Sequence, residues 1–358
     1  MKKITIIINS LLGGGAEKIC HLLALELTKR NYEIDLIVFE SVSNDLEEEV
    51  KAKVSGFISF ETINTKKSFF HLSKYLRENA DRTILCFGHQ IAITLYLIKK
   101  MFFTKNKIIC RNISTLSKQR NIHNTFFNKY LVELITKFLY KQIDIIIAQS
   151  NGMASDLVSN YGINKDKIKV ILNPVREPIY SDKASKDSFI LFVGKMKKAK
   201  GAYYLANVFN QVHQKKEDIK LYIVGPDGEE TEKFKQILDQ LSLTEYVKFE
   251  GMQNDLSYYY TNAELTVLTS IYEGLPNVLI ESISYGTPIV SFDTPSGPSE
   301  IIIEEENGYL CDYLNIDDMS SKILSALEQK WDKQKVRSTS QKFQIEIILN
   351  QYIKVLDE

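Results

Sequence analysis

Short apolar runs alternate with longer segments of helical periodicity along most of the chain. In the first half, continuous apolar runs predict strands at 4–9, 33–39, 82–87, 107–110 and 144–149. Between the first two runs, the apolar spacing from Ile19 to Leu27 fits a helix, so residues 4–39 predict a β–α–β unit. Strands that are apolar throughout are typical of a parallel sheet covered on both faces.

The same alternation begins again after a break. Asn173-Pro174 interrupts regular structure, and the polar stretch SDKASKDS at 181–188 is typical of a linker. Helices are predicted from about 201 and through KFKQILDQL. The predicted strands of this half are 189–194, 219–225, 247–251, 264–270, 288–292 and 308–312.

A chain of 358 residues with two such series is too long for one ordinary core. We therefore predict an α/β protein of two facing Rossmann-like domains with parallel sheets, and a ligand in the crevice at the carboxyl ends of the strands. The domains are placed at 1–173 and 174–337. The amphipathic segment 338–358 is expected to form a helix that packs back on the first domain.

The formal net charge of zero hides an unequal distribution. Residues 1–173 carry 25 Lys and Arg against 16 Asp and Glu, whereas residues 174–358 carry 20 against 29. Residues 90–142 hold ten bases and a single acid, interspersed with Phe, Tyr and Leu. We favour a surface at 94–142 that binds anionic lipid over two ordinary helices with buried apolar faces. No nucleic-acid motif accompanies these bases.

Three further features of the sequence limit where the protein is expected to act and which cofactors it is expected to use. No apolar run is long enough to span a bilayer, and the start of the chain shows no secretory signal. We expect a cytoplasmic protein, peripheral on the inner face of the membrane. The four cysteines form no C-x-x-C, and neither D-x-D nor a cluster of metal ligands occurs, so no metal and no other cofactor is expected.

The segment IYEGLPNVLIES at 271–282 carries the clearest chemistry. Glu273 lies in a turn after a predicted strand, Pro276 suits the first turn of a helix, and Glu281 shares a helix face with Asn277. A helix N-terminus favours phosphate, and carboxylates bind vicinal hydroxyls, so the segment suits a nucleotide sugar with one glutamate for each sugar ring. The alternative is that Glu273 is an ordinary turn residue and Glu281 a solvent-exposed helix residue, neither of which binds a ligand.

Two other loops follow predicted strands and open helices. VGKMKKAKG at 193–201 places Lys195 and Lys200 around a turn, where two ammonium groups can hold a diphosphate and stabilise its charge as it leaves. A lysine-rich turn is otherwise solvated surface. GGGAEK at 13–18 brings Gly14 and Gly15 to a helix start, as an anion-binding loop or a tight turn, but Lys18 breaks the dinucleotide fingerprint.

Taken in order, these segments resemble the family 4 retaining glycosyltransferases of the GT-B fold. The resemblance also rests on NPV at 173–175, IVGPDGEE at 223–230, FEG at 249–251, GTPIVSFD at 286–293, and GPSEII with NGYL within 297–310. It covers nearly the whole second half and parts of the first. It implies a bacterial enzyme of capsule or O-antigen synthesis that transfers a hexose or N-acetylhexosamine from a UDP-sugar to a lipid-linked glycan.

The resemblance also implies roles for single residues. Glu273 would contact the transferred sugar, Glu281 the ribose, and Lys195 with Lys200 the diphosphate; arginine is usual at the first of these lysines, so Lys195 keeps the charge but loses the bidentate fork. The residues expected around the donor are Gly14, Gly15, Gly225, Gly251, Gly274, Leu275, Pro276, Asn277 and Glu281, with uracil against Gly225 and Gly251. From the first domain, His89 or Arg111 would lie near the reacting sugar or acceptor, although a lone histidine is more often structural.

No carboxylate nucleophile is evident in the first domain. A retaining reaction then indicates same-face substitution, in which the departing phosphate oxygen helps to deprotonate the acceptor hydroxyl and the enzyme contributes positioning and charge. Two alternatives stay open: an epimerase or hydrolase of the same fold that acts on nucleotide sugars, and a non-catalytic scaffold subunit that only binds them. Turnover distinguishes the scaffold from the enzymes.

Overall fold

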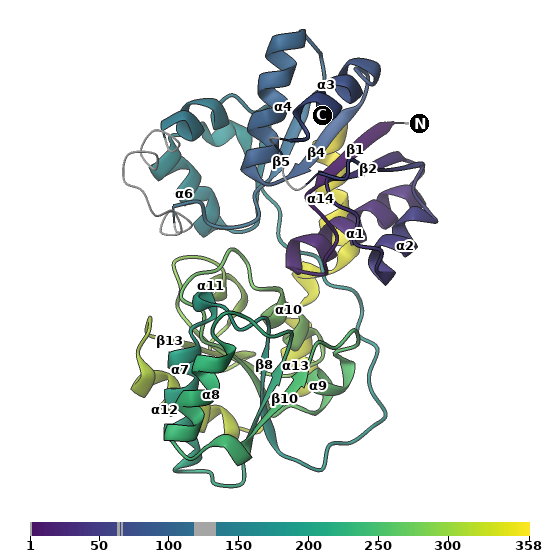
Figure 1. Ribbon diagram of the computed structural model, residues 1–358. Helices are drawn as coiled ribbons and strands as arrows, with labels where there is room; N and C mark the ends of the chain where they lie inside the picture. Colours follow the sequence, from purple (N-terminus) through teal and green to yellow (C-terminus); the bar gives the residue numbers. More distant parts are fainter. Residues whose placement is uncertain (1, 63–64, 66, 118–133) are drawn as a thin grey trace. The chain divides into compact units, whose positions relative to one another are not determined.

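The computed structural model describes residues 2–62, 65, 67–117 and 134–358. Within it the chain divides into two compact units (Figure 1). The first unit comprises Met1–Pro174 together with Glu346–Glu358, and the second comprises Val175–Ile345. The first boundary therefore lies one residue after the predicted one, and the second lies inside the segment predicted as a single C-terminal helix.

A seven-stranded parallel sheet forms the centre of the first unit, in the order β3-β2-β1-β4-β5-β6-β7. Its strands are β1 (Lys3–Ile8), β2 (Glu33–Val38), β3 (Gly56–Ser59), β4 (Thr83–Phe87), β5 (Ile108–Arg111), β6 (Ile145–Ala148) and β7 (Ile168–Val170). The five predicted strands are present. The two edge strands, β3 and β7, were not predicted because they are short and only partly buried, and so lack a continuous apolar run.

Helices cover this sheet and complete its core. They are α1 (Gly15–Lys29), α2 (Asp45–Lys51), α3 (Phe69–Glu78), α4 (His89–Phe102), a helix at 134–140, α6 (Asn151–Tyr161) and the C-terminal α14 (Ile345–Asp357). α14 is shorter than predicted and buries Ile348, Tyr352 and Leu356 in the first unit. Lys107 Nζ donates a hydrogen bond to the Val355 carbonyl at 3.1 Å, which fixes the end of the chain to this unit.

The second unit contains a six-stranded parallel sheet in the order β10-β9-β8-β11-β12-β13. The strands are β8 (Phe189–Val193), β9 (Lys220–Val224), β10 (Val247–Gly251), β11 (Leu265–Leu268), β12 (Ile289–Phe292) and β13 (Gly308–Cys311). The helices are α7 (Ala202–His213), α8 (Thr231–Gln240), α9 (Ser257–Asn262), α10 (Asn277–Ser284), α11 (Pro298–Ile301), α12 (Ile316–Glu328) and α13 (Lys333–Ser338). Every strand predicted for this half is found.

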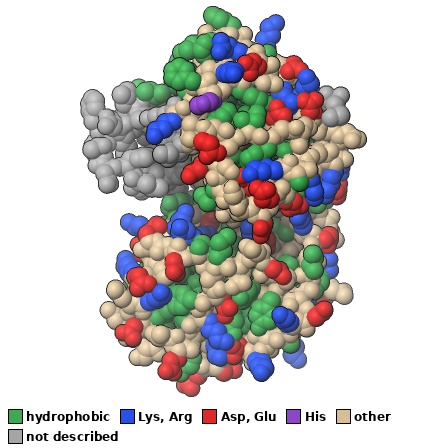
Figure 2. Space-filling view, turned by 45° about the vertical axis from the view of Figure 1, so that its right-hand side comes forward, with side chains coloured by type: hydrophobic (Ala, Val, Ile, Leu, Met, Phe, Trp, Pro, Cys, Tyr) green, Lys and Arg blue, Asp and Glu red, His purple; other side chains and the backbone are tan. Residues whose placement is uncertain are grey.

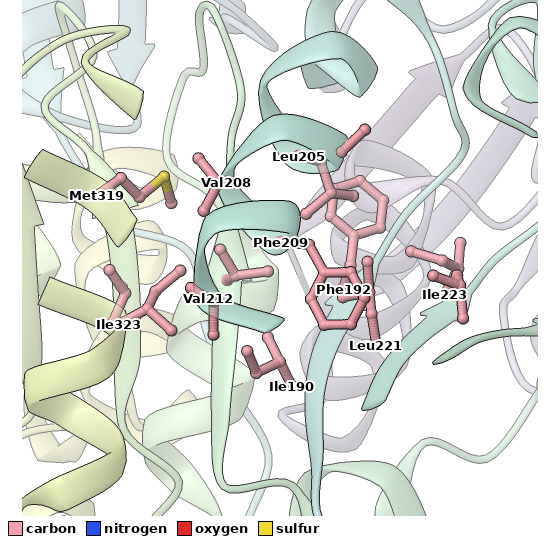
Figure 3. Close-up of a cluster of buried hydrophobic side chains, with 14 of the residues drawn as sticks. Ile190, Phe192, Leu205, Val208, Phe209, Val212, Leu221, Ile223, Met319 and Ile323 are labelled. Atoms are coloured by element: carbon pink, nitrogen blue, oxygen red, sulfur yellow. The ribbon is translucent and has the colours of Figure 1, made fainter. Parts of the chain in front are cut away.

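A buried apolar cluster fixes the helices of the second unit to its sheet. Val208 and Val212 of α7 lie close to Met319 and Ile323 of α12, and Phe192 of β8 lies in the same cluster (Figure 3). Phe192 is fully buried, and burial of a side chain of this size stabilises the fold by about 2–3 kcal/mol. The cluster therefore provides a rigid support for the loops at the carboxyl edge.

The polar stretch predicted as a linker is anchored at its end. The Asp187 carboxylate pairs with Lys220 at 2.6 Å and with Lys248 at 2.5 Å, and it accepts a hydrogen bond from the Tyr222 hydroxyl. These three donors hold the pKa of Asp187 well below its usual range. The chain is thus tied to the amino edge of the sheet immediately before β8 begins.

The strand order of the second sheet reverses between β8 and β11. β9 and β10 continue the sheet on one side of β8, whereas β11, β12 and β13 continue it on the other. In open α/β sheets, ligands bind at the carboxyl ends of the strands where the order reverses, which here are β8 and β11. The predicted basic turn and the predicted glutamate turn follow these two strands.

Candidate functional site

The two loops at this reversal point are fastened to each other. Thr269 Oγ1 donates to the Lys200 carbonyl at 2.9 Å, and the Ile271 amide donates to the Ala199 carbonyl at 2.8 Å. Gly201 has a φ of 68°, and a Cβ there would lie 2.2 Å from the Thr269 carbonyl oxygen. Only glycine permits so close an approach of the two backbones. The loops consequently hold their side chains in a fixed relation.

Lys200 and Glu273 meet across this junction. Lys200 Nζ lies 2.7 Å from Glu273 Oε1, and Ser270 Oγ donates to the same oxygen at 2.6 Å. The two side chains are 23% and 17% exposed, so the pair is neither fully solvated nor deeply buried. The Glu273 carbonyl in turn accepts a hydrogen bond from Ser296 Oγ at 2.7 Å. The structure therefore joins two residues that the sequence placed on separate loops.

Lys195 lies at the start of the same basic loop and is exposed. In the part of the chain that the structure describes, its ammonium forms no hydrogen bond and no ion pair. Its aliphatic stem passes Gly228, where an added Cβ would lie 3.2 Å from Lys195 Cγ. Unlike Lys200, this lysine has its charge in solvent, where long side chains remain adaptable.

A cavity of about 330 Å³ opens beside the ends of β9 and β10. Gly225, with a φ of 148°, and Gly251 form part of its wall, joined by a hydrogen bond from the Gly225 amide to the Gly251 carbonyl at 2.8 Å. Phe249 and Met252 add apolar surface and are 40% and 60% exposed. Sequence reasoning identified the glycines but missed these two side chains, although Phe249 is the first residue of the FEG motif and Met252 directly follows it. Partly exposed apolar walls beside backbone polar groups are typical of a small-molecule site.

Helix α10 begins at Asn277, and Pro276 is its N-cap with an extended ψ of 107°. The prediction placed Pro276 one position later, in the first helical turn. Gly274, Leu275 and Pro276 are all buried, so the chain enters α10 through a packed turn. The positive end of the helix dipole stabilises an anion near this turn.

Glu281 follows one helical turn after Asn277, and its side chain is half-buried. Its Oε2 accepts a hydrogen bond from the Tyr260 hydroxyl at 2.8 Å. Tyr260 is 1% exposed, and burial together with the Glu281 carboxylate raises its pKa well above the usual value. This contact was not predicted, because three successive tyrosines at 258–260 give no sign of which hydroxyl reaches a carboxylate.

Comparison with known proteins decides the family. Residues 13–177 match the family described as "Glycosyltransferase Family 4", and residues 177–343 match "Glycosyl transferases group 1". The two matches together span most of the chain. It belongs to the family 4 glycosyltransferases of the GT-B fold.

Several relatives resemble this glycosyltransferase over most of their length. One is the Campylobacter jejuni N-acetylgalactosamine-N,N'-diacetylbacillosaminyl-diphospho-undecaprenol 4-alpha-N-acetylgalactosaminyltransferase, 28% identical over 92% of this chain and 91% of the relative. Another is the amylovoran biosynthesis glycosyltransferase AmsD of Erwinia amylovora, 25% identical over 87% and 86%.

Solved structures share the fold of this glycosyltransferase. The Anabaena protein HepE in complex with UDP-glucose superposes with a TM-score of 0.82 over the full length of both chains at 18% identity. The apo form of the lipopolysaccharide outer core galactosyltransferase WaaB gives a TM-score of 0.75 at 21% identity, over 100% of this chain and 99% of the other. At these identities the superpositions establish the two-domain architecture.

The first unit of the glycosyltransferase carries the remaining predicted residues. Gly14 is the N-cap of α1 and Gly15 its first residue, directly after the loop that follows β1. His89 is the first residue of α4, immediately after β4, and its ring lies edge-on to Tyr140 at 6.1 Å. Burial lowers the pKa of His89 to about 4, so the imidazole is neutral at physiological pH.

Arg111 has a structural position, which corrects the expectation that it reaches a donor phosphate or an acceptor. It is 1% exposed at the end of β5. Its Nε donates to the Tyr352 hydroxyl at 2.9 Å, and its Nη2 donates to Asn173 Oδ1 at 2.6 Å. The guanidinium also lies 5.3 Å from the centre of the Phe87 ring. These contacts bind α14 to the sheet and leave Arg111 buried within the first unit.

A second cavity in the second unit, of about 350 Å³, contains none of the predicted residues. Linker residues 175–178, Ser284 at the end of α10, and side chains of the segment 334–344 line it. Its lining includes Arg337, which forms an ion pair with Glu177 at 2.9 Å. None of the residues that line this cavity directly follows β8, β9 or β10, whereas the 330 Å³ cavity includes Gly194, Gly225 and Gly251 at the ends of those strands.

Residues 2–62, 65, 67–117 and 134–358 contain neither a metal-ligand cluster nor a helix suited to span a membrane. Within these ranges, no group of three or more His, Cys, Asp or Glu side chains is arranged to hold a metal ion. Within the same ranges, no helix is sufficiently long and apolar to cross a membrane.

Proposed function

We propose that this glycosyltransferase acts with retention and moves a hexose or N-acetylhexosamine from a UDP-sugar to a lipid-linked glycan of a bacterial surface polysaccharide. The observation that carries the proposal is the Lys200–Glu273 pair at the carboxyl edge of β8 and β11, 2.7 Å across. The name of the Campylobacter jejuni relative describes an N-acetylgalactosaminyl transfer to a diphospho-undecaprenol-linked acceptor, which supports this class of acceptor.

The proposed donor lies along the carboxyl edge of the second sheet. Uracil occupies the 330 Å³ cavity against Gly225, Gly251 and Phe249. The ribose hydroxyls bind Glu281, and the diphosphate lies between the first turn of α10 and the two lysines Lys195 and Lys200. The transferred sugar then reaches Glu273, whose carboxylate accepts hydrogen bonds from sugar hydroxyls.

Departure of the nucleotide creates negative charge that the site must stabilise. The bond between the anomeric carbon and the phosphate oxygen breaks, and a bond from the acceptor oxygen to the same face of that carbon forms. The proton of the acceptor hydroxyl passes to the departing phosphate oxygen. Lys200 and the α10 dipole stabilise this oxygen, a contribution of roughly 3–4 kcal/mol for one preorganised donor. We propose that these cationic groups make a metal unnecessary; activity that survives EDTA would agree with this.

Peripheral membrane binding is part of the proposal, through the basic and apolar residues of 94–142. Residues 118–133 of this segment lie outside the described part of the chain. In the rest, Met101 is 59% and Phe103 88% exposed near exposed Lys100, and Phe138 is 69% exposed. In the upper part of Figure 2, apolar side chains lie beside lysine and arginine side chains, with acidic side chains among them. Such a surface favours anionic lipid on the cytoplasmic face.

Salt dependence separates this lipid binding from non-specific adhesion. The protein should sediment with vesicles that contain phosphatidylglycerol at low ionic strength and be released at 0.5 M salt, since screening weakens the attraction of bases to lipid headgroups. Neutral vesicles are the control. A protein that stays in the supernatant with anionic vesicles at low salt has no such surface.

The proposed function is tested by calorimetric titration with UDP, GDP, NAD and a panel of UDP-sugars, repeated with Glu281→Gln and Lys200→Ala. Micromolar binding of UDP and one UDP-sugar, weakened in both variants, supports the site and names the donor. The product anomer, read by NMR, then tests retention. Binding of NAD, or of no nucleotide, would overturn the proposal, and binding of a UDP-sugar without release of UDP would favour a scaffold subunit.

A further inference from the structure

Tyr260 is a buried phenol whose hydroxyl contacts one carboxylate of the proposed site. It lies on α9 and is 1% exposed, and its hydroxyl donates to Glu281 Oε2 at 2.8 Å. Burial, and then the charge of Glu281, raise the pKa of Tyr260 well above the usual value. The phenol therefore keeps its proton at every physiological pH and acts as a permanent donor.

The position of this hydroxyl is set by packing. The Tyr260 ring stacks on Tyr285 with centroids 5.5 Å apart and planes inclined by 27°. Tyr285 is packed in turn against the edge of Tyr180 at 5.6 Å. The Tyr260 carbonyl also accepts a hydrogen bond from the buried Thr287 hydroxyl. A ring enclosed in this way occupies a single position, so its hydroxyl is a rigid anchor for whatever it binds.

Glu281 uses only one of its two carboxylate oxygens in this contact. Among the described residues, no hydrogen bond other than that from Tyr260 is made to the Glu281 side chain. A carboxylate held by one oxygen can turn the other toward a ligand without losing further rotational freedom. Vicinal hydroxyls need such an oriented acceptor.

We propose that Tyr260 is a positioning residue for nucleotide recognition, which orients Glu281 so that its second oxygen accepts the ribose hydroxyls. The inference rests on the proposed UDP-sugar function. It makes the preference for a ribonucleotide depend on a phenol that never touches the nucleotide. A tyrosine that served the fold alone would instead affect the binding of every nucleotide equally.

The test compares the affinities of the full-length protein for UDP and for 2′,3′-dideoxy-UDP. In Tyr260→Phe the affinity for UDP should fall about tenfold, while that for the dideoxy compound stays unchanged, because a hydrogen bond to a charged group is lost. Tyr259→Phe is the matched control. Tyr259 is the neighbouring residue on α9, and its hydroxyl donates to a different carboxylate, Glu250 Oε2, at 2.9 Å. This variant should keep the wild-type ratio.

The possible outcomes distinguish failure of the role of Tyr260 from failure of the proposed UDP-sugar function. If wild-type protein binds neither compound, the proposed function fails and the inference fails with it. If wild-type protein prefers UDP and Glu281→Gln loses that preference while Tyr260→Phe retains it, only the role of Tyr260 is overturned. An equal loss for both compounds in Tyr260→Phe also overturns it, since that is the signature of a fold defect. Thermal unfolding of each variant checks the fold independently.

Discussion

Removal of the Lys200 ammonium should lower turnover far more than stability. In Lys200→Ala the proposed diphosphate loses its one charged donor that is fixed at the junction of the two loops, 2.7 Å from Glu273. Loss of a single preorganised donor costs about 100- to 1,000-fold in kcat. Lys198 in the same loop is exposed and has no role in the proposed site. Lys198→Ala should therefore keep kcat within about threefold and serves as the matched control.

The stability cost of the same change is worked from burial. Exposed ion pairs contribute about 0–1 kcal/mol, and breaking a buried pair costs about 3–5 kcal/mol. With side chains 23% and 17% exposed, Lys200 and Glu273 lie between these limits, so Lys200→Ala should lose about 1–2 kcal/mol in urea unfolding. Most of this loss in stability arises because the partly buried Glu273 carboxylate no longer has a cationic partner. The double variant Lys200→Ala/Glu273→Gln should recover stability without recovering kcat.

The assay is release of UDP at saturating donor and acceptor, with urea unfolding on the same preparations. A Lys200→Ala enzyme with wild-type kcat would refute the assignment of Lys200 to the leaving diphosphate. So would an equal loss in Lys198→Ala, because the effect would then come from the net charge of the loop.

Four further changes have defined outcomes. Glu273→Gln should lower kcat about 100-fold yet bind UDP at least as tightly, since Lys200 loses its competing partner; calorimetry and UDP release measure both. Gly201→Ala should cost at least about 2 kcal/mol in urea unfolding, because its Cβ would meet the Thr269 carbonyl, whereas Gly251→Ala, with a similar φ of 66° but open space, should cost less. Asp187→Asn should destabilise the protein by about 1 kcal/mol near pH 7, and the difference from wild type should begin to shrink below about pH 4 and disappear only near the lowered folded-state pKa, since the stabilising contribution is lost between the unfolded-state and the folded-state pKa. Wild-type protein should lose stability between about pH 6.5 and 4, because in this range His89 takes up a proton in the unfolded chain but not when it is buried in the fold. His89→Gln should show a smaller loss over the same range.

The central strands could be predicted because a strand that is buried on both faces is apolar at almost every position. β4 and β5 are apolar runs in sequence and are buried throughout most of their length. The edge strands β3 and β7 lack such a continuous apolar run, because one side of each strand faces solvent. The end of the chain was less readable: the amphipathic helix predicted at 338–358 starts where α13 (Lys333–Ser338) of the second unit ends, whereas α14 begins only at Ile345 and belongs almost entirely to the first unit.

The sequence was sufficient to predict which loops form the candidate site. It was not sufficient to predict which side chains of these loops contact one another. That Lys200 and Glu273 both follow strands was visible in sequence; that those strands, β8 and β11, are neighbours depends on the sheet order. Arg111 looked like any polar residue at a strand end. Its partner Tyr352 lies 241 positions later, so nothing local distinguished a buried anchor from a ligand contact.

The Lys200–Glu273 pair explains how one site can be stable without its ligand and still ready to bind it. A cation that is 23% exposed needs a partner, because desolvated charge is costly, and Glu273 supplies that partner in the structure. In the proposed donor complex, the diphosphate carries more charge than one carboxylate and would therefore replace Glu273 as the partner of Lys200. Glu273 would then be available to accept hydrogen bonds from sugar hydroxyls beside the same lysine. The exchange requires both loops to stay in place while the partners change, and the backbone bonds from Thr269 and Ile271 to the 199–200 carbonyls meet that requirement.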